Sequence, residues 1–139
     1  MQRIPGAIGY VEYAYALQNK MAYASLQNRD GAWIKPDAKS FQATAAHADW
    51  AKAPGFYAIL TNEPGKESWP ITDATFILMH KTQANPEGAK QVLDFFKWAY
   101  EHGDKMTEDL GYIPMPDQVV QLIYQEWKAI QGPDGKPVY

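Results

Sequence analysis

Cysteine is absent from this sequence of 139 residues, and arginine occurs only at Arg3 and Arg29. The first absence excludes disulfides, thiolate nucleophiles and sulfur-ligated metals. The net charge is −3, and no run of consecutive Lys or Arg exceeds two residues. The chain therefore has no basic surface of the kind that attracts nucleic acid, and we expect no nucleic-acid partner.

Long apolar runs are also missing. No stretch of 18 apolar residues is present, so the sequence predicts no transmembrane helix. The first residues, Met-Gln-Arg-Ile-Pro-Gly, contain no apolar h-region of a secretory signal peptide. We expect that the chain is truncated and begins inside a longer protein.

The apolar residues that are present suffice for one domain or two small half-domains, because 46% of residues are hydrophobic and 14% are aromatic. The first part predicts a strand over residues 7–12, a short helix over 13–20 and a hairpin over 21–35. Ser40 is expected to cap the next helix. The apolar positions of that helix are Phe41, Ala45, Ala48 and Trp50.

The polar segment 61–67 contains a Pro-Gly pair and is predicted to be a loop at a boundary between two lobes. The apolar run 76–79 follows the β-branched Thr75. A short continuous apolar run is typical of a strand covered on both faces, so we expect a central strand of an α/β sheet here.

Helices follow this strand. Asn85 and Pro86 predict the start of a helix that ends at Gly103, and residues 104–110 predict a further turn or two. The apolar face of the first helix is expected to contain Val92, Phe95, Phe96, Ala99 and Tyr100. After Pro116, helical spacing relates Val119, Val120, Ile123, Trp127 and Ile130. Packing on the chain's own sheet explains this stripe, and docking of a partner helix is the alternative.

Three segments together resemble a known family. They are residues 68–81, reading Ser-Trp-Pro-Ile-Thr-Asp-Ala-Thr-Phe-Ile-Leu-Met-His-Lys, residues 5–16, and the closing Gly-Lys-Pro-Val-Tyr. The chain resembles the C-terminal part of the phosphate-binding protein of bacterial ABC transporters. The resemblance runs nearly end to end but corresponds to about the last two fifths of such a protein.

The resemblance implies the C-terminal portion of a two-lobed type II periplasmic-binding-protein fold, an α/β fold with a mixed sheet flanked by helices. Residues 1–68 would be part of the second lobe. Residues 69–139 would supply a crossover strand and C-terminal helices to the first lobe, with a hinge near Pro70. It also implies a periplasmic location, inorganic phosphate as ligand and an ABC permease as partner.

The phosphate-contacting motifs of that family have no counterpart in this chain. An oxyanion site uses helix N-termini, hydroxyls and an arginine fork, and in the family the arginine precedes a Ser-Gly-Thr turn. Neither Arg3 nor Arg29 is followed by such a turn. We therefore assign no catalytic, ligand-binding or metal residue and expect no cofactor.

Two groups of residues near the predicted hinge have both a functional and a structural interpretation. Thr72, Asp73 and Thr75 are either a polar cluster at a cleft or, as we favour, residues that solvate the crossover. Trp69 and Pro70 are either a gate over a ligand or, as we favour, hinge and packing residues.

The titratable candidates also have ordinary interpretations. His47, His80 and His102 lack the spacing of a zinc site. Glu12 lies in an apolar stretch but has no visible nucleophilic partner, so we expect it to be solvated or salt-bridged. The aromatic residues Tyr10, Tyr13, Tyr15, Tyr23 and Trp33 mix strand and helix periods and are not expected to form one binding platform.

The interpretation that we favour is therefore a non-enzymatic fragment of a phosphate-transport protein. Such a fragment would self-associate or be complemented by an N-terminal segment, because it exposes sheet edges. A stand-alone interaction or structural module without anion binding is one alternative. A hydrolase of phosphate esters is another, although no nucleophile, base or metal constellation supports it.

Overall fold

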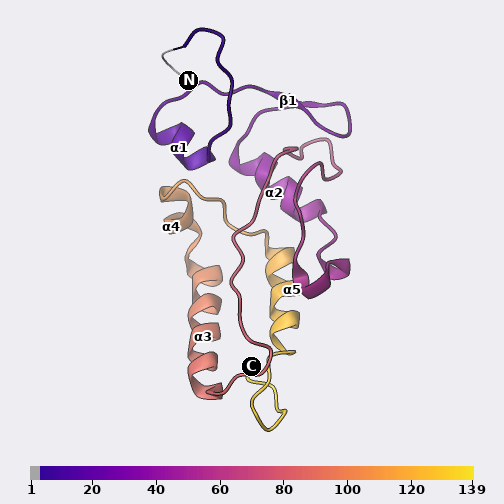
Figure 1. Cartoon of the computed structure of the whole chain (residues 1–139), viewed down its shortest axis with the longest axis vertical. Coiled ribbons are helices and arrows are strands. Elements are labelled where there is room, and N and C mark those ends of the chain that lie inside the picture. Colours follow the sequence, from indigo (N-terminus) through magenta and orange to yellow (C-terminus); the bar gives the residue numbers. More distant parts are fainter. Residues whose placement is uncertain (1–3) are drawn as a thin grey trace.

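A computed structural model describes residues 4–139 of the chain. The molecule is elongated, with the N-terminal residues at one end and the C-terminus near the other (Figure 1). Helices α3 (Pro86–His102) and α5 (Asp117–Trp127) occupy the C-terminal half of this shape, and in this view the extended residues 71–82 run between them. The architecture combines helices with a small antiparallel sheet.

The N-terminal part contains the predicted helix and hairpin. Helix α1 (Tyr13–Gln18) buries its two alanines, and strand β1 (Leu26–Gln27) pairs antiparallel with β2 (Trp33–Ile34). Gly31 provides the positive φ of +81° that the hairpin turn requires. The strand predicted over residues 7–12 is wrong, because these residues form no ladder with any described part of the chain.

Helix α2 (Ala38–His47) begins one turn earlier than its predicted cap. Asp37 is the N-cap, and its Oδ1 accepts a hydrogen bond of 2.8 Å from the backbone N–H of Ser40. Ser40 in turn accepts a hydrogen bond of 3.0 Å at its hydroxyl from the N–H of Asp37. This reciprocal capping box satisfies two amide donors that a helix start leaves without partners.

A small core lies where α2, the chain after it and α5 meet. Its buried members are Ala45, Trp50, Leu60 and Val119. Two 3₁₀ turns, η1 (Trp50–Lys52) and η2 (Pro54–Phe56), bring the Trp50 and Phe56 rings into a stack at 5.3 Å. The Trp50 indole N–H donates to the carbonyl of Ala45 at 2.7 Å, so this large ring is buried with its polar atom paired.

The predicted central strand over residues 76–79 does not form. The segment is extended, but no described residue forms a ladder with it. Phe76 packs on the core, whereas Leu78 is 92% exposed. A strand covered on both faces needs neighbouring strands in its sheet, and within residues 4–139 the only sheet is the β1–β2 pair.

Helix α3 starts as predicted. The Asn85 side chain accepts a hydrogen bond of 3.1 Å from the N–H of Gly88, and Pro86 occupies the first turn. The predicted apolar face is right in part. Phe96, Ala99 and Tyr100 are partly buried, whereas Val92 and Phe95 are exposed and the fully buried positions are Ala89 and Leu93. The local pattern contains two apolar stripes, and only the tertiary arrangement selects between them.

The C-terminal half ends in an aromatic cluster. After α4 (Asp104–Asp109), helix α5 places Tyr124 and Trp127 against Tyr100 of α3, at ring distances of 6.3 and 6.4 Å. The ring of Tyr139 meets Trp127 edge-on at 5.2 Å, which anchors the C-terminal residues.

In the part of the chain that the structure describes, no helix combines the length and apolarity that crossing a membrane requires.

Candidate functional site

Trp69 is anchored to helix α2 by its backbone and its ring. Its N–H donates to the Ser40 carbonyl at 3.1 Å, and its carbonyl accepts a hydrogen bond of 2.9 Å from the Thr44 hydroxyl. The indole is buried and meets the ring of Phe41 edge-on at 6.3 Å. These contacts place Trp69 in packing, as predicted, and leave no opening in which its ring would cover a ligand.

The loop that precedes Trp69 is fixed by Asn28. This buried side chain donates hydrogen bonds of 3.0 to 3.1 Å to the carbonyls of Gly65, Lys66 and Ser68. Its Oδ1 accepts from the backbone N–H groups of Asp30 and Ala32. One amide thus joins the β1–β2 turn to the loop. The sequence indicated only that Asn28 lies within the hairpin predicted over residues 21–35, and it gave no sign of this distant contact.

Two further contacts hold the same loop. The Asp30 carboxylate accepts a hydrogen bond of 2.9 Å from the N–H of Gly65, whose φ is +111°. Ser68 is fully buried, and its hydroxyl donates to the Pro64 carbonyl at 2.7 Å. The loop is therefore a rigid connector whose polar groups are occupied by the protein itself.

Thr72, Asp73 and Thr75 do not form a cluster of donors. The Thr72 hydroxyl donates back to the Trp69 carbonyl at 3.3 Å, and Asp73 accepts from the neighbouring N–H of Ala74 at 2.9 Å. Thr75 is exposed. Each of these side chains serves the local backbone or solvent.

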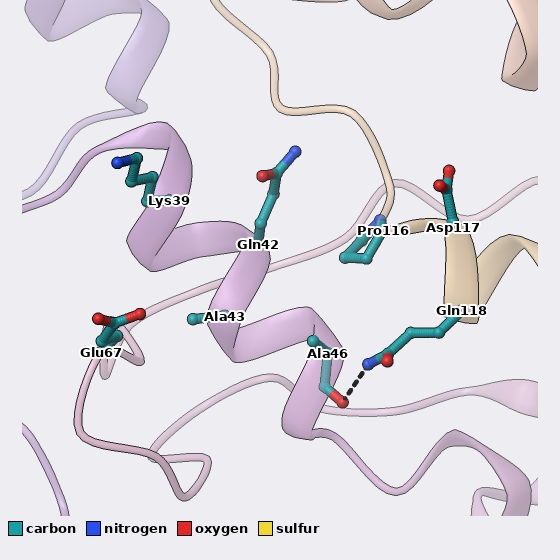
Figure 2. A pocket seen from close by; sticks show the side chains of 8 residues that line it. All are labelled: Lys39, Gln42, Ala43, Ala46, Glu67, Pro116, Asp117 and Gln118. Carbon is teal, nitrogen blue, oxygen red and sulfur yellow. Dashed lines mark hydrogen bonds between the residues drawn. The ribbon is translucent and has the colours of Figure 1, made fainter.

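An open groove of about 540 Å³ lies between α2, the loop and the start of α5 (Figure 2). The Gln118 side chain reaches across from α5 and donates to the Ala46 carbonyl of α2 at 2.9 Å. The charged residues in the lining are Lys39, Glu67 and Asp117. Two carboxylates and one ammonium give this groove a field that disfavours a phosphate dianion.

The histidines lie apart and have individual roles. The Nδ1–H of His47 donates to the Ala43 carbonyl at 2.7 Å, and His102 packs its ring against Trp98 at 5.9 Å in the last turn of α3. His80 is exposed. Among residues 4–139, no three His, Asp or Glu side chains are grouped closely enough to hold a metal ion.

The other residues considered in the sequence analysis, which are Glu12, the arginines and the N-terminal aromatic residues, do not form a common site among the described residues. Glu12 is exposed and lies beside Tyr112, where its carboxylate raises the pKa of the Tyr112 hydroxyl. Arg29 is exposed in the hairpin turn, and Arg3 lies outside the described residues. Tyr10 and Trp33 point into solvent, while Tyr13 contacts Tyr23 and Phe41, so the aromatic residues do not line one surface.

Comparison with known proteins shows strong similarity to one group, although no family model matches the chain. The chain is 49% identical over 140 residues to the phosphate-binding protein PstS of Pasteurella multocida, a match that covers 100% of the chain and 41% of the relative. The phosphate-binding proteins PstS of Xylella fastidiosa and Haemophilus influenzae are 49% and 51% identical over 93% and 88% of the chain. The chain spans about two fifths of the length of these curated relatives.

Proposed function

We propose that this chain, which is homologous to a segment of the phosphate-binding protein PstS, forms part of a protein that captures inorganic phosphate for uptake by an ABC transporter. The observation that carries the proposal is the 49% identity over the whole chain. The complete protein would act in the periplasm and deliver phosphate to a permease. We assign it no catalytic role.

Within such a protein the chain would supply scaffold, while other parts of the polypeptide supply the phosphate contacts. Phosphate binding needs many fixed donors and positive charge. In this chain Arg29 is exposed in a hairpin turn, and the groove beside α2 carries more carboxylates than ammonium groups. These features support a binding site built elsewhere in the complete protein.

The division of the chain near Trp69 rests on the resemblance to a two-lobed fold, since in the structure Val119 packs in one core with Ala45, Trp50 and Leu60. Residues 1–68 would belong to the second lobe and residues 69–139 to the first lobe of a two-lobed fold. The tethers from Trp69 to Ser40 and Thr44 would fix one side of a hinge at Pro70, so that closure rotates the chain after this point.

The test replaces the matching segment of the Pasteurella multocida relative by this chain and measures phosphate binding calorimetrically. We expect the chimera to bind phosphate and to discriminate against sulfate. The same relative with the segment deleted is the control and should not bind. A folded chimera that fails to bind phosphate would overturn the proposal.

A second candidate is a self-associating or free-standing interaction module without anion binding. It is favoured by the exposed apolar side chains of residues 71–78 and of α3. Sedimentation of the isolated chain, together with titration by phosphate, separates the two. Stable self-association combined with a chimera that does not bind would favour the module.

A further inference from the structure

The sequence contains the dipeptide Asp-Gly twice, at Asp30-Gly31 and at Asp134-Gly135. The structure places both dipeptides in the same kind of turn. In each turn the N–H of the glycine donates to the carbonyl three residues before it, at 3.0 Å in the first and 3.1 Å in the second. Both glycines have a positive φ, of +81° and +75°. The two sites differ in how the protein holds the aspartate carboxylate.

An aspartate followed by glycine reacts with its own backbone. The glycine nitrogen attacks Cγ of the aspartate, a C–N bond forms, and the carboxyl hydroxyl leaves together with the amide proton as water. Water then opens the resulting five-membered succinimide at either carbonyl, which restores aspartate or produces isoaspartate. The main chain of isoaspartate runs through Cβ and is one methylene longer. Glycine favours the attack because it has no Cβ in the way, and the carboxyl group must be free to rotate towards the main chain.

Asp30 is held by a group that is distant in the sequence. Its carboxylate accepts a hydrogen bond of 2.9 Å from the N–H of Gly65, which lies 35 residues further along the chain. The N–H of Asp30 donates to the buried Asn28 side chain at 3.1 Å, and Asn28 also donates to the carbonyl of Gly65. Rotation of the Asp30 carboxyl group towards Gly31 therefore requires the hydrogen bond to Gly65 to break.

The carboxylate of Asp134 finds its partners, within residues 4–139, inside its own turn. It accepts a hydrogen bond of 3.1 Å from the N–H of Lys136 and lies 3.4 Å from the Lys136 ammonium. These side chains are 56% and 83% exposed, so their ion pair is weak. Because both partners belong to a residue two positions away, the carboxyl group rotates through motion of the turn alone.

We propose that Asp134 is a site of spontaneous modification, at which the folded protein forms isoaspartate through a succinimide, while the hydrogen bond to Gly65 protects Asp30. Water is the only co-reactant, and it is released in the first step and consumed in the second. The rate depends on how often the turn adopts the reactive conformation, and exposed turns open locally far more often than the core. The reaction is independent of the proposed capture of phosphate.

Modification at Asp134 should loosen the end of the chain. Its turn closes a hairpin formed by residues 130–139, in which the N–H of Val138 donates to the carbonyl of Ile130 at 2.9 Å. The last ring of this hairpin, that of Tyr139, packs edge-on against α5 at 5.2 Å. The register of a hairpin depends on the length of its loop, so an additional methylene in the turn displaces one arm against the other.

The test ages the purified chain at neutral pH and measures isoaspartate at each site by peptide mapping with an isoaspartate methyltransferase. We expect isoaspartate to accumulate at residue 134 at least about fivefold faster than at residue 30. The same comparison in urea is the control, because the unfolded chain keeps both dipeptides and their neighbours but loses the hydrogen bond to Gly65. In urea the two rates should agree within about twofold. Equal rates in the folded protein, or a fivefold difference that persists in urea, would overturn the inference.

Asp134→Glu tests the effect on the hairpin. Glutamate keeps the negative charge, but its longer side chain does not form the five-membered ring, so this variant should age without modification at residue 134. We expect the amide of Val138 to exchange at least about tenfold faster in the isoaspartate form of the unchanged chain than in the aged variant. Asp30→Glu, aged in parallel, is the matched control and should behave as the unchanged chain does. Equal exchange of Val138 in the isoaspartate form and in aged Asp134→Glu would overturn the effect on the hairpin.

Discussion

The side-chain amide of Asn28 donates a hydrogen bond of 3.1 Å to the carbonyl of Ser68, a residue 40 positions further along the chain. The two N–H groups of this amide are shared among three carbonyls, since it also donates to Gly65 and Lys66, and one side chain in a hairpin turn thus organises the loop that leads to Trp69. A buried amide with this many partners is costly to remove, because each carbonyl that it satisfies loses its donor.

Asn28→Ala should therefore destabilise the fold by about 2–4 kcal/mol, as expected for a buried network left without its central donor. Urea unfolding followed by circular dichroism measures the free-energy change. Arg29→Ala is the control, since the neighbouring side chain is exposed, and it should change stability by less than about 0.5 kcal/mol. Similar losses in the two variants would contradict the role given to Asn28.

We expect Gly65→Ala to lower the free energy of unfolding more than Gly135→Ala does. Both glycines have positive φ, +111° and +75°, so each substitution introduces backbone strain. At Gly65 a Cβ would also lie 2.8 Å from the His47 ring and from the Ser68 hydroxyl, whereas at Gly135 nothing lies within 4 Å. We expect the difference in unfolding free energy to be at least about 1 kcal/mol.

A second substitution tests the origin of that difference. His47→Ala removes the ring that the new methyl group meets, so it should recover part of the loss in the Gly65→Ala background. A double-mutant cycle measures this coupling. Additive effects would show that the clash with His47 is not the cause.

Leu93→Ala and Val92→Ala test the register of α3. Leu93 is 0% exposed and Val92 is 42% exposed. Truncation of the buried leucine should cost about 2–5 kcal/mol, and truncation of the valine less than about 1 kcal/mol. The reverse order would restore the face that the sequence predicted.

We expect the free energy of unfolding to fall in alkaline solution because of Tyr100 in the aromatic cluster. Burial raises the pKa of Tyr100 from its ordinary value of 10.0, so the folded protein holds this proton more tightly than the unfolded chain. The stabilisation that results from this raised pKa is complete below pH 10. It is lost as the pH rises from there through the pKa of Tyr100 in the folded protein.

Tyr100→Phe should make the decline in unfolding free energy between pH 9 and about 11 shallower, because one group with a raised pKa is removed. Tyr57→Phe, at an exposed ring outside the cluster, controls for the loss of a phenol as such. An unchanged slope in Tyr100→Phe would show that Tyr100 does not contribute to the alkaline loss.

The local structure was predictable wherever neighbouring residues decide it. Asn85 and Pro86 fix the start of α3, the Asn-Arg-Asp-Gly turn produces the hairpin, and Pro116 separates the last helix from the chain before it. Each of these signals acts over a few residues, through a helix cap, a turn angle or a missing amide donor. They can therefore be recognised in one sequence without knowledge of distant contacts. The similarity to a phosphate-binding protein was likewise evident from segments 5–16 and 68–81.

The sequence by itself determined the helices, the turns, the rarity of arginine and the relationship to a longer protein. Tertiary contacts were needed to establish that Leu93 rather than Phe95 is buried, that Asn28 fixes the loop before Trp69 and that the run 76–79 remains unpaired. The physical reason is common to all three. Burial and strand pairing depend on groups far away in the chain, and an apolar run has the same composition whether or not a neighbour covers it.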